Sequence, residues 1–274
     1  PAVRPQLKGY AVGDGCAGTD VLCGPTHADW YKVIFFFGHG QISNLLFDAI
    51  LDTCGMDYLK RGGKTPPGCQ ANLDEVDAQV GGYYDYNLYD DCIYEDDLRR
   101  RLTADAVGGA LNDYVCGGGD AQNEWVNQSA VREALHVPSD AFFFSGDNGV
   151  GMNYSLTEKN VMPIYKRAAK EGLRVLVYNG DTDPGINSFV SQDWTAALGY
   201  STSQTWRPWT LDGCKRMGGY VTRYEHDFDF LTIRGSGHMV PQFKPAAAHE
   251  FLRAWLEDED YKPYVKSCTK PSDF

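Results

Sequence analysis

The sequence predicts an α/β fold, in which helices flank a mostly parallel sheet, together with a helical insertion held by disulfide bonds. Two short apolar runs, residues 173–178 and 230–233, are rich in β-branched and large side chains, as buried strands are. Helical patterns alternate with these runs, which is typical of a parallel sheet. The composition differs between residues 14 and 156, where six of the eight cysteines and many tyrosines lie.

The amino-terminal half begins with a predicted strand at residues 6–13, which runs into a glycine turn. Two helices are expected next, at 27–31 and at 42–58. In the second, apolar side chains recur at helical spacing and Ser43 can cap the helix. Also expected before residue 156 are a helical turn at 74–80, an extended tyrosine- and aspartate-rich run at 83–94 and a short helix at 127–135.

The carboxyl-terminal part, from residue 157 on, has the pattern of a regular α/β domain. A helix that stops at Gly172 starts either at a capping box over 155–158 or at Pro163. The elements that follow are a strand at 173–178, a helix at 188–198, a hairpin of 205–210 with 219–224, a strand at 230–233 and a helix that opens at Pro245. The apolar face of the last helix consists of Ala248, Phe251, Leu252 and Trp255.

Composition excludes some classes of function and favours others. The net charge of −12 argues against nucleic acid as a partner, because phosphates demand a basic face, and it is compatible with work at acidic pH. No apolar run approaches the ~20 residues needed to span a bilayer. An even count of eight cysteines favours an oxidising compartment. The sequons at Asn127 and Asn153 also favour the secretory pathway and are expected glycosylation sites.

Two glycine-containing turns follow the predicted strands, and each carries a reactive side chain. Asp183 follows the strand at 173–178, and His238 follows the strand at 230–233. In open α/β sheets, working residues lie just beyond the carboxyl ends of strands. An imidazole that takes a nucleophile's proton and a buried carboxylate that orients the imidazole are two parts of a catalytic triad. Asp181 is an equally good acid by composition. The other histidines show no metal-ligand spacing, so no metal is expected, and no organic cofactor is implied either.

These turns resemble those of the serine carboxypeptidase family, the lysosomal and vacuolar carboxypeptidases of the α/β-hydrolase fold. The matching segments are 178–183 with Asn187, 235–241, 8–15, 37–43, 131–137 and 152–155. The resemblance implies a partial α/β-hydrolase core, with residues 1–13 as a core strand, 14–156 as a cap over the active site and 157–274 as the part that carries the acid and the histidine. It selects Asp183 over Asp181, since the acid of hydrolases follows the pattern Gly-x-x-Asp, here from Gly180.

The resemblance also implies roles for further residues. Met239 lines the pocket for the substrate's terminal residue, or it is simply packed in the core. Asn187 supports the turn of the acid or caps the next helix. The triplet at 99–101 is a solvated helix face or a processing site, since some relatives mature into two chains. Cys92–Cys116 would match a bridge that the family carries in its insertion.

For the other cysteines, local spacing favours bridges Cys16–Cys23 and Cys54–Cys69. Cys214 and Cys268 are the remaining pair, and either could instead bond to a segment outside the chain.

One family motif has no counterpart in the sequence. The nucleophile elbow, Gly-x-Ser-x-Gly, should precede Lys8, and the pattern occurs nowhere in the 274 residues. We therefore expect a truncated or processed carboxyl-terminal portion of an enzyme, inactive alone. The expected partners are a peptide substrate and the segment or chain that carries the serine, and a homodimer is compatible with the sequence.

The expected function is that of a serine-type carboxypeptidase, which hydrolyses C-terminal residues from peptides at acidic pH in a lysosome or vacuole or after secretion. The alternatives are an acyltransferase of the same family and a non-catalytic binding or protective homologue.

Overall fold

A computed structural model describes residues 6–18, 29–90, 118–141 and 157–269. The contacts divide the chain into two compact units, Pro1–Tyr89 with Glu158–Phe274, and Asp90–Thr157. The boundaries predicted for the insertion, residues 14 and 156, stay a prediction. Among the helices of the described segments, none has both the length and the apolar content of a membrane span.

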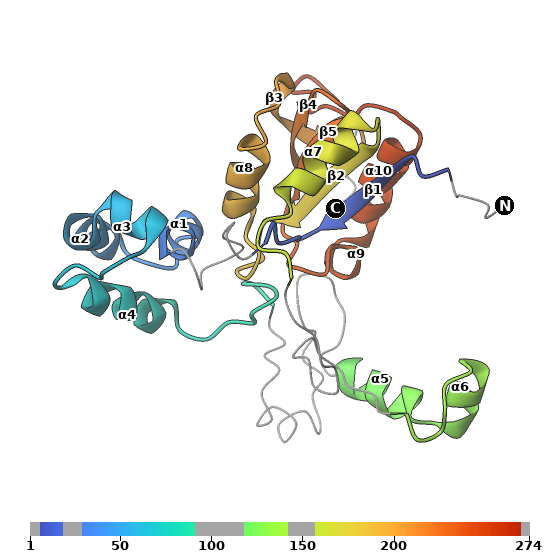
Figure 1. Ribbon diagram of the computed structural model, residues 1–274, viewed down its shortest axis with the longest axis horizontal. Helices are drawn as coiled ribbons and strands as arrows, with labels where there is room; N and C mark the ends of the chain where they lie inside the picture. Colours follow the sequence, from blue (N-terminus) through green and yellow to red (C-terminus); the bar gives the residue numbers. More distant parts are fainter. Residues whose placement is uncertain (1–5, 19–28, 91–117, 142–156, 270–274) are drawn as a thin grey trace. The chain divides into compact units, whose positions relative to one another are not determined.

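The first unit contains a five-stranded sheet of order β1-β2-β5-β4-β3 (Figure 1). β1, β2 and β5 are parallel, and β4 and β3 continue the sheet as an antiparallel hairpin. The strands are β1 (Gly9–Gly13), β2 (Arg174–Gly180), β3 (Thr202–Thr210), β4 (Met217–Tyr224) and β5 (Phe228–Ile233). The predicted fold class is confirmed, and the hairpin extends the main sheet.

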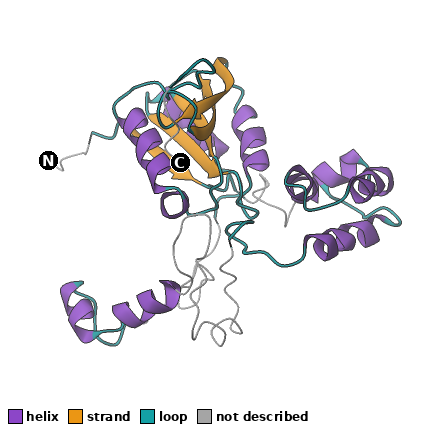
Figure 2. Ribbon diagram, turned by 180° about the vertical axis from the view of Figure 1, so that it is seen from behind, coloured by secondary structure: helices purple, strands orange, loops and turns teal. Residues whose placement is uncertain are grey.

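Helices cover both faces of this sheet (Figure 2), so its central strands are apolar on both sides. On β2, Val175 and Val177 pack with residues of α7 (Met162–Lys170) and α8 (Ser188–Ala196). Leu176, which points to the opposite face, packs with residues of α9 (Val240–Phe243) and α10 (Pro245–Leu256). Every residue of β5 is buried, as a strand between two helix layers requires.

Helix ends follow local signals where a glycine or a cap is present. Gly172 ends α7 with a φ of +70°, and that helix begins at Met162, close to Pro163, so a start at the capping box over 155–158 is wrong. Ser43 caps α2, because its Oγ accepts from the Leu46 amide at 3.2 Å. The single helix predicted at 42–58 is wrong, since Gly55, with a φ of +73°, separates α2 from α3.

The remaining helices of the first unit are α1 (Asp29–Gly38), α2 (Asn44–Cys54), α3 (Met56–Arg61) and α4 (Cys69–Val80), and they share one apolar cluster. The Cys54–Cys69 disulfide joins the end of α2 to the start of α4. The second unit contains α5 (Gly118–Val126) and α6 (Ser129–Ala134), of which the sequence predicted only the latter.

The Cys214–Cys268 disulfide is also present, and Cys16 is disulfide-bonded. Cys23, Cys92, Cys116 and the basic triplet at 99–101 lie outside the described residues.

Helix α10 orients its apolar side chains differently from the prediction. Phe251 is buried with 2% of its surface exposed, whereas Leu252, expected on the same face, is 40% exposed. The two residues are neighbours, about 100° apart around the helix axis, so Phe251 can point at the sheet while Leu252 lies at the edge of the buried face.

We predict that Phe251→Ala lowers the free energy of unfolding by about 3–5 kcal/mol, because it leaves a cavity under the sheet. Leu252→Ala is the matched control and should cost less than about 1 kcal/mol. Urea denaturation of the purified chain measures both values. Equal losses for the two variants would contradict this orientation of α10.

Candidate active site

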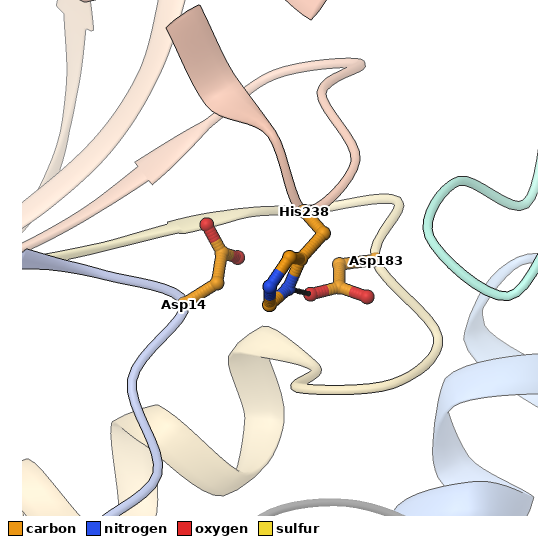
Figure 3. A group of neighbouring side chains, drawn as sticks. All are labelled: Asp14, Asp183 and His238. Carbon is orange, nitrogen blue, oxygen red and sulfur yellow. Dashed lines mark hydrogen bonds and ion pairs between the residues drawn. The ribbon is translucent and has the colours of Figure 1, made fainter. Parts of the chain in front are cut away.

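The two turns predicted to carry reactive groups leave the sheet side by side. β2 and β5 are parallel neighbours, and their last residues, Gly180 and Ile233, lie opposite each other in the ladder. Asp183 therefore comes close to His238, with His238 Nδ1 2.8 Å from Asp183 Oδ2 (Figure 3). The contact joins residues 55 positions apart in the sequence.

The acid and the imidazole differ in their exposure to solvent. The Asp183 side chain is fully buried, whereas 31% of the His238 side chain is exposed. Asp183 Oδ1 accepts from the Gly185 amide at 2.9 Å, so both carboxylate oxygens have a partner. Nδ1 must carry the proton in this contact, because a carboxylate only accepts. The arrangement holds one ring nitrogen firmly and leaves part of the ring open to a reactant.

Close backbone approach fixes the two turns, and glycine makes that approach feasible. A methyl group on Gly180 would lie 2.2 Å from the Ser236 carbonyl oxygen. That oxygen accepts from the Thr182 amide at 2.9 Å, so the turns are hydrogen-bonded directly. A methyl group on Gly237 would lie 2.1 Å from the Tyr86 carbonyl oxygen. A side chain at either glycine would force the turns apart.

A third segment, residues 84–88, joins the turns, and the sequence did not predict it. The Tyr86 carbonyl accepts from the His238 amide at 2.8 Å, and the ring centroids of these two residues lie 5.3 Å apart. The Leu88 amide donates to the Thr182 carbonyl, and Thr182 Oγ1 donates to Asn87 Oδ1 at 2.8 Å. The extended run expected at 83–94 is wrong over the described residues 83–90, since Tyr84 and Asn87 bridge a turn and Asn87 is fully buried.

Asp14, directly after β1, lies beside the pair (Figure 3). Its Oδ1 accepts from the Gly180 amide at 2.9 Å, and its side chain is 5% exposed. One oxygen of Asp14, one oxygen of Asp183 and one nitrogen of His238 lie within 4.8 Å of one another. Burial, and then the charge of Asp183, raise the pKa of Asp14 well above 3.8.

The sequence analysis did not predict a role for Asp14. Working residues lie just beyond the carboxyl ends of strands, and Asp14 directly follows the strand predicted at 6–13, so the same rule could have found it.

The three groups are spaced as metal ligands can be, but we do not assign them as ligands. Two of the three groups, Asp183 and His238, already satisfy each other through the contact between Oδ2 and Nδ1, and Asp183 Oδ1 accepts from the Gly185 amide.

Asp181, the alternative acid, serves the backbone of the turn. Its Oδ1 accepts from the Gly235 amide at 2.6 Å. Burial raises its pKa, an effect that this hydrogen bond and the charge of His39 partly offset. The structure therefore brings Asp183 to the imidazole and Asp181 to the neighbouring turn.

The other predicted site residues are placed as follows. Met239 is partly buried, directly after His238 and before α9, and its pocket role stays a prediction. Asn187 caps α8, since its Oδ1 accepts from the Val190 amide at 3.3 Å. Asn127 is exposed, and its Nδ2 donates to the Asn123 carbonyl at 2.7 Å. Asn153 lies outside the described residues, and glycosylation of either asparagine stays a prediction.

A sequence profile of the serine carboxypeptidases matches residues 2–258. The chain belongs to the serine carboxypeptidase family. A serine carboxypeptidase of Caenorhabditis elegans is 28% identical over 96% of this chain and 60% of its own length. The lysosomal protective protein of Mus musculus is 29% identical over 93% of this chain and also 60% of its own length. The chain thus spans about 60% of the length of these two serine carboxypeptidase relatives.

The fold is also similar to a solved carboxypeptidase structure. A prohormone-processing carboxypeptidase from Saccharomyces cerevisiae superimposes with a TM-score of 0.56 at 16% identity. The match covers 92% of this chain and 55% of the yeast chain. At this identity the likeness supports the carboxypeptidase fold of the sheet and its helices.

We predict that Gly237→Ala displaces the histidine turn, because the new methyl group would collide with the Tyr86 carbonyl. The expected loss of stability is about 1–3 kcal/mol, as for other overpacked sites. The hydrogen-bonded Nδ1 proton of His238 should also shift or broaden in the proton NMR spectrum.

Gly82→Ala is the matched control, since nothing lies within 4 Å of a methyl group there, and it should stay within about 0.5 kcal/mol of the parent protein. An unperturbed Nδ1 signal in Gly237→Ala would show that close approach of the turns does not hold the pair.

Proposed function

We propose that this protein is the carboxyl-terminal part of a serine-type carboxypeptidase that removes C-terminal residues from peptides at acidic pH. The observation that carries the proposal is the contact of 2.8 Å between a fully buried acid, Asp183, and a partly exposed imidazole, His238. Family membership supports the reaction class. The nucleophile is assigned to a segment outside these residues, since the sequence has no Gly-x-Ser-x-Gly.

In the proposed reaction His238 acts first as a general base and then as a general acid. Its Nε2 accepts the proton of the serine hydroxyl while the serine oxygen bonds to the carbonyl carbon of the last peptide bond. The same proton passes to the leaving amine as the C–N bond breaks, and a water molecule then releases the acyl group by the reverse sequence. Asp183 keeps the proton on Nδ1 and stabilises the imidazolium that forms.

We further propose that the protein works in the lysosome or vacuole or after secretion. The two described disulfides support an oxidising compartment, because cytosolic thiols are kept reduced. Hydrolysis at acidic pH fits the same location. The peptide substrate and the serine-bearing segment are the partners that this proposal requires.

We predict that the chain becomes a peptidase when it is assembled with the segment that carries the elbow serine. In that assembly Asp183→Asn should lower kcat about 10⁴-fold, because the amide no longer holds the required tautomer. His238→Ala should cost at least as much. Release of the terminal amino acid from a blocked dipeptide at acidic pH measures the activity, and an alcohol acceptor added to the assay would reveal acyl transfer instead.

The matched controls are Asp48→Asn and His249→Ala, which change exposed residues of α2 and α10 and should leave kcat unchanged within about twofold. Cleavage by the chain without the serine segment, abolished in His238→Ala, would contradict an external nucleophile. Full activity of Asp183→Asn would remove the assignment of the acid.

A further inference from the structure

The proposed reaction gives no role to Asp14, although this buried carboxyl group faces the pair. Asp14 lies in the turn that follows β1, whereas Asp183 and His238 lie in the turns after β2 and β5. Its backbone has a φ of +44°, a left-handed conformation that aspartate and asparagine tolerate better than most residues. The Gly180 amide donates to Oδ1, while Oδ2 is buried and makes no hydrogen bond with the described residues. The Gly180 amide and the Asn179 side chain act to lower the pKa of Asp14, but burial and the charge of Asp183 outweigh them and raise it.

An ionised Asp14 would fit this environment poorly. The titratable groups that face it are Asp183, His238 and Tyr178, of which His238 alone can carry a positive charge. Asp183 can only accept while it is ionised, so it cannot satisfy a second carboxylate. Burial, and then the charge of Asp14, raise the pKa of the Tyr178 hydroxyl. A proton on Oδ2 of Asp14 would remove the repulsion and turn the unpartnered oxygen into a donor.

We propose that Asp14 is a positioning residue that keeps a proton on Oδ2 while Asp183 is ionised, and that it donates this proton to Asp183, so that His238 faces one negative charge instead of two. The inference rests on the proposed function for its meaning, because it concerns the same imidazole. Its geometric basis is independent of that function. Oδ2 of Asp14 is buried without a hydrogen bond and lies close to the buried carboxylate of Asp183.

The proton proposed on Asp14 affects the pH range in which His238 can act as a base. An opposite charge within about 4–6 Å favours the charged imidazole by one to three pKa units, so a second carboxylate would keep His238 protonated over a wider pH range. A neutral Asp14 leaves the imidazole free to accept the serine's proton at lower pH. Asp14 and His238 would then titrate as a coupled pair.

The test is an NMR titration of the His238 ring in the purified chain, which needs no nucleophile or activity. In the parent protein the ring signals should show two inflections, one from the imidazole and one from Asp14. Asp14→Asn keeps an acceptor for the Gly180 amide and should leave a single inflection. Asp181→Asn, a change to another buried acid of the same loops, should keep both. Infrared difference spectra should show a protonated carboxyl band in the parent that Asp14→Asn lacks.

A single inflection in the parent protein, with no carboxyl band assigned to Asp14, would overturn the proposal. A downward shift of the His238 titration by one unit or more over the whole range in Asp14→Asn would also overturn it, because Asp14 would then be ionised throughout. These outcomes concern charge alone, so they are distinguishable from failure of the peptidase assay.

Thermal unfolding gives a second measurement with a fixed sign. An acid whose pKa is raised on folding contributes stability below its unfolded value of 3.8, and that contribution is lost as the pH rises through the folded value. Asp14→Asn has no such group and does not lose this stability. The melting temperature of the variant minus that of the parent should therefore increase as the pH rises above about 4. A difference that does not change with pH would contradict a protonated Asp14.

Discussion

The parallel pairing of β2 with β5 is the constraint on which the site depends. It sets Gly180 opposite Ile233, so two turns that are far apart in the sequence leave the sheet at adjacent points. Gly180 then lets the turns touch as bare backbone, with the Ser236 carbonyl bonded to the Thr182 amide. This direct backbone contact holds the buried carboxylate and the imidazole at hydrogen-bond distance.

The electrostatics of the site follow from the same geometry. Three parallel strands end at one edge, and each contributes a titratable group there: Asp14 after β1, Asp183 after β2 and His238 after β5. Two acids and one base in a mostly buried space cannot all be ionised without a net negative charge. Asp183 contacts His238, while burial, and then the charge of Asp183, raise the pKa of Asp14.

Glycines and capping side chains in the sequence correctly predicted several helix ends. Gly172 stops α7, Ser43 caps α2 and Asn187 caps α8, as glycine and short polar side chains do at helix ends. The predictions failed where neighbours decide the conformation. Apolar periodicity could not tell Phe251 from Leu252, because both side chains suit a buried face and only the position of the sheet selects one.

The sequence by itself determined the strands and the acidic and histidine turns at their ends, because apolar runs and turn chemistry are encoded within a few residues. Its resemblance to the family then selected Asp183 over Asp181. The tertiary structure alone decided that residues 84–88 join the turns of Asp183 and His238 and that Asp14 lies against Asp183. Both depend on contacts between segments about 100 residues or more apart, such as Asn87 with Thr182 and Asp14 with Gly180, which are 95 and 166 positions apart. Partners at that separation leave no pattern in the local sequence, since strand pairing in the folded sheet is what selects them.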